Sequence, residues 1–447
     1  MITETIAIIN GRLIDPVRGT EEVTNLLINS NGVITGMGYL PDDDEETTTV
    51  IDVKGRFIIP NITDSHCSLR EPGHEDKETF LSASDAAVTG GITALIATPD
   101  THPTVDTPEM VSFIHARRRA AGIVPIYPMG ALSKGINGLE LAELRLMHDA
   151  GAVGFTDGNS LEHTGLMRHA LQYSSDLDRP IIVTADDPLL SQNGVMNEGY
   201  YSTILGLRGI HAESEELRIA RDIELVERFG GVLHFFPVST AQSVELVRRA
   251  KARGLAITCG TSPHYLYFDE SAIDGYPTNF KVLPPFRSAS DRQALIDGIK
   301  DGTIDAIASH HQPHTIDGKR TDFVDADPGI SGIDTLVCTT LTKLVRDEGL
   351  SMVDVSRLLS SNPLAIFRIK RPGIALMKRP SFTVIDMKTD FTLESSQFKS
   401  KGLNSPFIGR QFTGKSLMTV IEGRIRFIDP SLKPTTGTLV VSKDPTT

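Results

Sequence analysis

Residues 90–100 read GGITALIATPD, in which two glycines precede an apolar run and a polar segment follows it. The run at 92–97 has the length and β-branched content of a buried strand. Similar runs alternate with longer amphipathic stretches between about residues 57 and 310, a pattern typical of repeated strand and helix units. We expect eight such strands, at residues 57–59, 92–97, 124–127, 152–155, 181–184, 232–236, 256–259 and 304–308.

Helical patterns separate these strands. In residues 213–229, Leu217, Ala220 and Ile223 recur at spacings of three, and residues 290–300 open with Ser290 followed three positions later by Gln293, a capping-box pattern. Eight strand–helix units over about 250 residues are typical of a (β/α)8 barrel of the TIM type, an α/β fold. Functional side chains are then expected just after each strand, where the strands end.

The two flanks of the chain have a different pattern of short strands and turns. Asn10-Gly11, Asn31-Gly32 and Glu422-Gly423 are hairpin signals within them. We therefore expect a barrel at residues 57–370, and a small β domain built from both chain ends, residues 1–56 and 371–447.

Composition limits the partners and the location. A formal net charge of −13 argues against nucleic acid or an anionic membrane surface as a partner. The three cysteines Cys67, Cys259 and Cys338 form no CxxC pair, so neither a disulfide framework nor a thiolate zinc site is indicated. No apolar run approaches the roughly 18 residues of a membrane span, and residues 1–12 lack a signal-peptide pattern, so we expect a cytoplasmic protein.

Residues 64–70 read DSHCSLR, and on this segment the chain resembles the dihydroorotases of the amidohydrolase superfamily. The resemblance continues in family order over almost the whole chain, through residues 97–103 (ATPDTHP), 154–158 (GFTDG), 195–199 (VMNEG), 238–241 (VSTA), 284–287 (PPFR), 301–308 (DGTIDAIA), 361–363 (SNP) and 404–407 (NSPF). It implies a barrel that opens or closes a cyclic amide with a zinc-activated water and an aspartate for proton transfer.

Several positions that the resemblance assigns to zinc or catalysis carry other residue types. Ser68 and Thr184 stand where the family has liganding histidines, Pro237 stands at a further liganding position, and His310 replaces the catalytic aspartate. His66 and Asp157 keep the family's ligand types. Because a catalytic zinc site usually needs three protein ligands, we expect no metal, no other cofactor and no catalytic residue.

The substrate positions implied by the resemblance are also mixed. Arg70 and His314 are retained, whereas Asp100 and Leu283 each replace an asparagine. An aspartate beside Arg70 would pair with the guanidinium and repel an anionic ligand. We therefore expect weak or absent binding of dihydroorotate or carbamoyl aspartate, with these positions vestigial.

The first hypothesis is a non-catalytic subunit, not an enzyme. The chain is similar to the dihydroorotase-like chains that assemble with the catalytic chains of aspartate transcarbamoylase in pyrimidine biosynthesis. That likeness implies aspartate transcarbamoylase as partner, and a homo-oligomer within the complex.

Two alternatives stay open. One is an active metal-dependent cyclic amidohydrolase with a rearranged site of one zinc, held by His66, Asp157 and His310. His311 is not expected to join His310 there, because adjacent strand residues face opposite sides, and His234 is expected to be a core residue. The other is a barrel that senses a pyrimidine intermediate through Arg70 and His314.

Overall fold

The computed structural model describes residues 5–38, 48–121, 123–159 and 161–437. Strands β6 (Thr63–Cys67), β7 (Ala94–Ala97) and β8 (Ile126–Pro128) form one parallel sheet, and β9 (Ile181–Val183), β12 (Leu233–Phe235), β13 (Ile257–Thr261) and β14 (Ala306–Ile307) form another. Parallel bridges from Phe155 to Gly130 and to Ile181 join the sheets on one side, and a bridge from Cys67 to His311 joins them on the other. The pairings therefore run around a closed structure, called here the strand ring.

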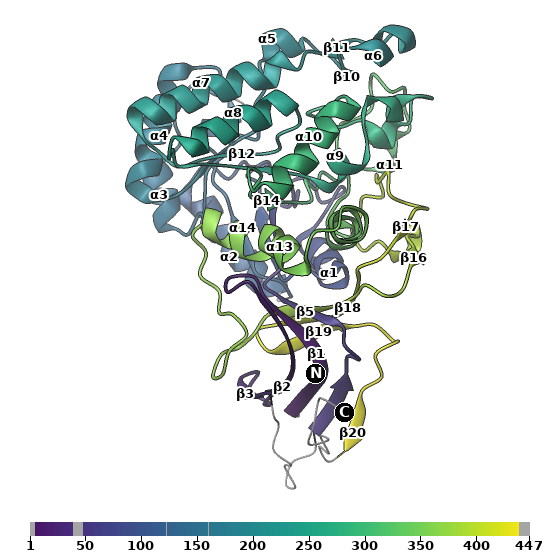
Figure 1. Cartoon of the computed structure of the whole chain (residues 1–447). Coiled ribbons are helices and arrows are strands. Elements are labelled where there is room, and N and C mark those ends of the chain that lie inside the picture. The colour runs from purple at the N-terminus through teal and green to yellow at the C-terminus, as the bar shows by residue number, and fades with distance from the viewer. Residues whose placement is uncertain (1–4, 39–47, 122, 160, 438–447) are drawn as a thin grey trace.

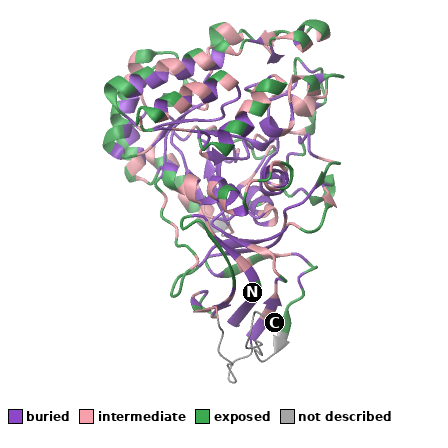
Figure 2. Ribbon diagram, viewed as in Figure 1, coloured by how far each residue is buried: buried purple, intermediate pink, exposed green. Residues whose placement is uncertain are grey.

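Helices surround the strand ring (Figure 1). They are α1 (Phe80–Gly90), α2 (Pro108–Ala121), α3 (Leu144–Asp149), α4 (Thr164–Leu177), α7 (Glu213–Phe229), α8 (Ala241–Ala252), α10 (Ala289–Lys300), α12 (Leu336–Leu341), α13 (Met352–Ser356) and α14 (Asn362–Ile366). Most of them bury one apolar stripe, as α7 does with Ile219, Ile223 and Val226, and expose the other side to solvent, whereas α12 is buried along its whole length. Figure 2 shows this division, with buried residues on the inner faces and exposed residues on the outer ones.

Shorter elements follow the carboxyl ends of the ring strands. They are η1 (Lys134–Ile136), α5 (Pro188–Ser191), β10 (Met196–Asn197), α6 (Tyr200–Leu205), β11 (Gly209–Ile210), α9 (Pro263–Tyr267), η2 (Glu270–Ile273), η3 (Thr278–Phe280) and α11 (Ile316–Lys319). Because all ring strands are parallel, these connections gather at one end of the ring.

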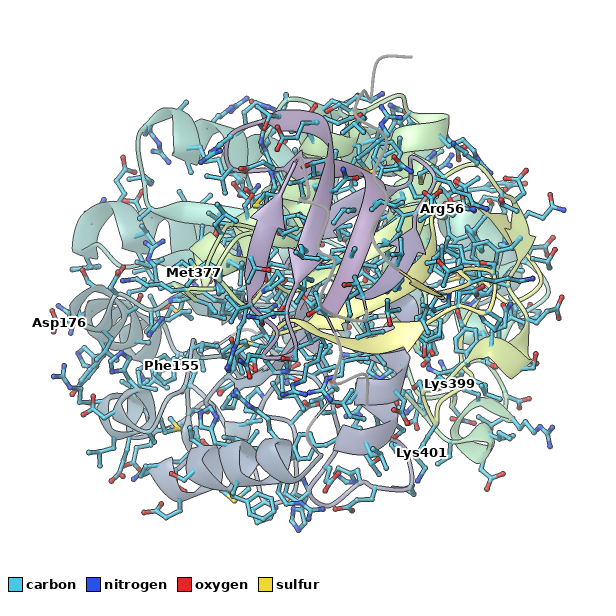
Figure 3. The ribbon with its side chains drawn as sticks, turned by 90° about the horizontal axis from the view of Figure 1, so that it is seen from below. Arg56, Phe155, Asp176, Met377, Lys399 and Lys401 are labelled. Carbon is cyan, nitrogen blue, oxygen red and sulfur yellow. The ribbon has the colours of Figure 1, made fainter. Side chains whose placement is uncertain are left out.

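A nine-stranded sheet lies below the ring and takes strands from both flanks of the chain (Figures 1 and 3). Its strands are β1 (Thr5–Asp15), β2 (Thr20–Ile28), β3 (Ile34–Met37), β4 (Thr48–Asp52), β5 (Phe57–Pro60), β15 (Phe382–Asp386), β18 (Lys415–Ile421), β19 (Arg424–Ile428) and β20 (Thr435–Gly437). Ile8, Leu26, Ile58, Val384 and Met418 belong to its buried core. Five short elements complete the chain. The elements η4 (Thr342–Asp347) and η5 (Arg357–Ser361) precede β15, and β16 (Phe391–Thr392), η6 (Ser395–Gln397) and β17 (Gln411–Phe412) lie between β15 and β18.

The expected α/β class is confirmed, but the first predicted strand was assigned to the wrong sheet. Residues 57–60 form β5, which pairs with β1 and β15 in the lower sheet. The first ring strand is β6, whose sequence TDSHC is mostly polar yet buried throughout, because its side chains are enclosed by the ring and the helices. The exact domain boundaries stay a prediction.

Two local predictions also need correction. Helix α10 is capped by Ser288, with Asp291 completing the capping box, whereas Gln293 bonds Asp297 on the exposed face. The Asn10-Gly11 pair is a bulge within β1, where the register with β2 shifts, and not a hairpin turn. The other two glycine pairs do join antiparallel strands, β2 to β3 and β18 to β19. Among the described helices, none is both long and apolar enough to cross a membrane.

Candidate functional site

A cavity of about 580 Å³, called here the upper cavity, lies at the carboxyl end of the strand ring. It brings together residues from connections that are far apart in the sequence. Nine of the ten site positions proposed from the sequence line it: His66, Ser68, Arg70, Asp100, Asp157, Thr184, Leu283, His310 and His314. Pro237 is not among its lining residues.

Histidine rings form a row beside the upper cavity. The ring centroids of His66 and His310 are 5.8 Å apart, and the ring of His264 stacks on His310 at 5.8 Å with an interplanar angle of 18°. Burial lowers the pKa of His66 to about 4 and that of His310 to about 3, so both rings are neutral at pH 7. Nδ1 of His66 and Nε2 of His264 are buried without a hydrogen-bond partner in the described part of the chain.

The connection after β14 orients His310 toward the cavity and His311 away from it. His310 has a φ of 52°, in the left-handed region. Nδ1 of His311 accepts a hydrogen bond from the Gly332 amide at 3.1 Å, and its Nε2 is 3.3 Å from Oε2 of Glu78. The two adjacent histidines therefore face opposite sides as predicted, although His310 has left-handed and not strand geometry.

Asp64 fixes the base of this connection. Its fully buried carboxylate accepts hydrogen bonds from the backbone amide of Ser309, at 2.9 Å, and from the Ser309 hydroxyl. These bonds connect β6 to the segment that carries His310. The two segments are neighbours at the point where the strand ring closes. Burial raises the pKa of Asp64 despite them.

The Asp157 carboxylate holds the loop after β8. It accepts hydrogen bonds from the backbone amides of Leu132 and Ser133, at 2.8 and 2.9 Å, and from the Ser133 hydroxyl at 2.5 Å. Burial raises the pKa of Asp157 against the effect of these bonds. Asp157 thus lines the cavity, but its oxygens already serve as acceptors within the protein.

The family's zinc arrangement does not fit the residues present. The Ser68 hydroxyl donates to Asp100, Thr184 donates to the carbonyl of Phe236 at 2.9 Å, and Pro237 has no ligand atom. Within the described ranges, no group of three or more histidine, cysteine, aspartate or glutamate side chains is arranged to hold a metal ion. The expectation of no cofactor, with one zinc as its alternative, stays a prediction.

Arg70 and Asp100 form an ion pair on the cavity wall. Nη1 of Arg70 donates to Oδ2 of Asp100 at 2.8 Å, and Asp100 also accepts from Ser68 at 2.8 Å and from Thr98 at 2.5 Å. Burial alone would raise the pKa of Asp100, but Arg70 and the two hydroxyls outweigh it, so that pKa is lowered and the group stays ionised. The pair leaves little net charge at this wall.

His314 and Leu283 lie farther along the cavity wall. Nδ1 of His314 is 2.9 Å from Oδ2 of Asp327, and its Nε2 is 2.9 Å from the carbonyl of Pro328. Burial lowers the pKa of His314 to about 4. Leu283 is 40% exposed and presents an apolar side chain.

Two buried residues of the site were missed from the sequence. His264 lies in α9, the element after β13. Arg287 lines the cavity, with Nη1 bonded to the Asn197 side chain at 3.0 Å and to the Ile210 carbonyl at 2.9 Å. Both carried a signal: His264 lies just past a predicted strand, and Arg287 ends the PPFR segment.

Comparison with known proteins identifies the family. The family described as "Dihydro-orotase-like" matches residues 55–243. A dihydroorotase of Caldanaerobacter subterraneus subsp. tengcongensis is 38% identical over 423 residues, which cover 94% of this chain and 97% of the relative. The chain belongs to the dihydroorotase family.

Two further proteins are also similar to this chain over most of its length. A dihydroorotase of Syntrophus aciditrophicus is 39% identical over 416 residues, 93% of this chain and 97% of that protein. The solved L-hydantoinase of Arthrobacter aurescens superposes with a TM-score of 0.82 at 24% identity, covering 96% of this chain and 98% of its own, which shows a shared fold.

The prediction of a non-catalytic subunit, not an enzyme, is wrong. The relatives that match this chain over nearly its whole length are named dihydroorotases. The inference failed because the loss of the zinc ligands does not remove the other features of a catalytic site. The upper cavity, its neutral imidazoles and its polar wall are all present. Assembly with aspartate transcarbamoylase chains, and a homo-oligomer, stay predictions.

Proposed function

We propose that this chain is an active cyclic amidohydrolase that opens a ring amide, of the kind found in dihydroorotate and the hydantoins, and closes it in reverse. The observation that carries the proposal is the upper cavity, into which His66 and His310 project as neutral imidazoles. Family membership supports the reaction class, and the closed strand ring supports its interpretation as the expected (β/α)8 barrel.

The ring-opening step uses a water molecule and one imidazole. The water oxygen forms a bond to the ring carbonyl carbon while His310 accepts the water proton. The carbon–nitrogen bond of the ring then breaks, and the same proton passes to the departing nitrogen, which leaves an open-chain ureido product. At pH 7 His310 is neutral and its ring nitrogen carries a lone pair that can take the proton. Because burial lowers its pKa to about 3, the protonated ring gives the proton up readily to the departing nitrogen. The residues present provide this step without a metal, because the side chains of the described residues form no metal-binding group.

The cavity wall bears on the choice of substrate. Arg70 is the cation best placed to meet a substrate carboxylate, but Asp100 already occupies one of its amino groups. A neutral ring ureide therefore loses less free energy on entering the upper cavity than an anionic one, which has to compete with Asp100 for the guanidinium of Arg70. We accordingly propose that hydantoin and dihydrouracil are better substrates than dihydroorotate.

A substrate panel tests this proposal. The purified chain is incubated with dihydroorotate, dihydrouracil and hydantoin, and with N-carbamoylaspartate for ring closure, before and after dialysis against a chelator. We expect ring opening that the chelator leaves intact. The absence of turnover with every substrate would overturn the proposed reaction, and activity lost on chelation and restored by zinc would overturn the metal-free step.

A further inference from the structure

A second cavity, of about 280 Å³, lies at the opposite end of the ring from the upper cavity and is called here the lower cavity. Asn61, which precedes β6, lines it, as do Pro60, Ser361 and the turn after β1 at residues 15–18. Its walls thus come from the amino end of the strand ring and from both flanks of the chain. Figure 3 is drawn from this side of the molecule, with the strands of the lower sheet in front.

Arg371 gives the lower cavity a cation without a matching anion. Its Nη1 donates to the Thr93 hydroxyl at 2.9 Å, and no carboxylate of the described residues lies within ion-pair distance of its guanidinium. Burial lowers the pKa of Arg371, while Tyr127 and Glu422 act in the opposite direction. A partly buried guanidinium with open donors is the usual partner of a carboxylate or phosphate.

Asn61 adds an unused acceptor beside that cation. The residue is 5% exposed, its Nδ2 donates to the carbonyl of Pro372 at 2.9 Å, and its Oδ1 has no partner. The bond to Pro372 sets the orientation of the amide, so Oδ1 is the atom left free. A buried acceptor without a partner costs free energy, which a ligand N–H or O–H would recover.

The remaining charges of the lower cavity leave it net positive. Asp15 is the one carboxylate among its lining residues; it accepts hydrogen bonds from the amides of Val17 and Arg18 and lies 3.6 Å from the Arg18 guanidinium. The lining residues therefore carry two guanidinium groups and one carboxylate, in a chain whose formal net charge is −13. A local positive potential on such a chain favours anions at this place.

We propose that the lower cavity binds a small organic anion, a carboxylate or a phosphate, that also carries an N–H or O–H donor. Arg371 takes the anionic group and Oδ1 of Asn61 accepts the donor. Since a water molecule takes about 30 Å³ in the liquid, the cavity has room for a ligand of roughly ten non-hydrogen atoms. This site is separate from the proposed reaction and does not depend on it.

The lack of tryptophan in the chain allows a local optical test. Val17 lines the lower cavity and is 81% exposed, so Val17→Trp introduces a single reporter without disturbing the core. Val23, which is 67% exposed on β2 and outside the cavity, provides the control reporter Val23→Trp. Fluorescence of both is titrated with inorganic phosphate, acetate and N-carbamoylglycine.

We expect a saturable signal for Val17→Trp and none for Val23→Trp. Phosphate or N-carbamoylglycine should bind at least about tenfold more tightly than acetate, which lacks a donor once ionised, and the stronger of the two identifies the anionic group. Adding Asn61→Asp, which places a carboxylate beside Arg371 at a left-handed position that aspartate tolerates, should weaken binding at least about tenfold.

Arg371→Gln provides a second test of the same site, and both variants are first checked for an unchanged circular dichroism spectrum. No saturation with any probe up to about 10 mM would overturn the proposal, because it would place the affinity outside the range of a specific site. Saturation that survives both Asn61→Asp and Arg371→Gln would overturn it as well, since the signal would then not come from the two groups that define the site.

Discussion

The guanidinium of Arg70 donates to the carboxylate of Asp100 at 2.8 Å on the wall of the upper cavity. The protein thus carries its own anion at the place where a substrate carboxylate would meet the arginine. Asp100→Asn removes that competitor and should lower the KM for dihydroorotate about tenfold, while the KM for hydantoin changes little.

Asp186→Asn is the matched control for this change. Asp186 lines the same cavity but accepts from the Ser191 hydroxyl at 3.0 Å and has no bond to Arg70. Steady-state kinetics of both variants separate a specific effect from a general loss of negative charge. An equal drop in KM for both would refute the assignment of substrate choice to Asp100.

His310→Asn removes the proposed proton acceptor and keeps a residue type that tolerates the left-handed backbone at this position. Turnover should fall about 10²- to 10⁴-fold, the usual contribution of general acid–base catalysis. Progress curves of ring opening measure the loss. His163→Asn, in which the residue at the N-cap of α4 is changed, should retain full activity; if His310→Asn also does, His310 is not the acceptor.

The buried His234 should make the fold sensitive to acid. Burial lowers its pKa to about 3, below the 6.5 of an exposed histidine. As the pH falls below about 6.5, the unfolded chain gains a proton that the folded chain does not, so the free energy of unfolding falls by about 1.4 kcal/mol per pH unit for this group. The free energy of unfolding is measured with denaturant at pH 5, 6 and 7. Its slope against pH should be smaller in His234→Asn, by about the 1.4 kcal/mol per pH unit that one proton contributes, and identical slopes would contradict this.

Ser309→Ala tests the side-chain bond between Ser309 and Asp64, which lies where the strand ring closes. It leaves the buried Asp64 carboxylate without its hydroxyl donor, which should reduce the free energy of unfolding by about 1–3 kcal/mol. The midpoint of urea unfolding provides the measurement. Ser112→Ala, on the exposed face of α2, is the comparison and should change the free energy by less than about 0.5 kcal/mol.

The sequence predicted the ring strands with apolar runs and failed where a strand is polar. Residues 92–97 and 181–184 contain β7 and β9, whereas the TDSHC strand β6 lacked the expected pattern, and β5 was mistaken for it. Strand periodicity indicates burial against an apolar layer; it does not detect a strand with buried polar side chains, such as Asp64, which is bonded by Ser309 from a distant segment.

Nine of the positions proposed from the sequence line one cavity, because residues that follow successive parallel strands converge. Its internal bonds were less accessible from the sequence. The Arg70–Asp100 pair was anticipated from the resemblance, but the bond of Asp64 to Ser309 joins positions 245 apart, and no local pattern signals it. The stacking of His264 on His310 likewise depends on how two connections pack.

The lower sheet has a consequence for synthesis on the ribosome. Strand β5 pairs on one edge with β1 and on the other with β15, and Arg56 bonds Asp386 across 330 positions of the chain. In the nascent polypeptide that second edge stays open until β15 has been translated, more than 320 residues after β5. Prematurely terminated chains therefore expose an unpaired apolar strand and should be prone to aggregation and proteolysis.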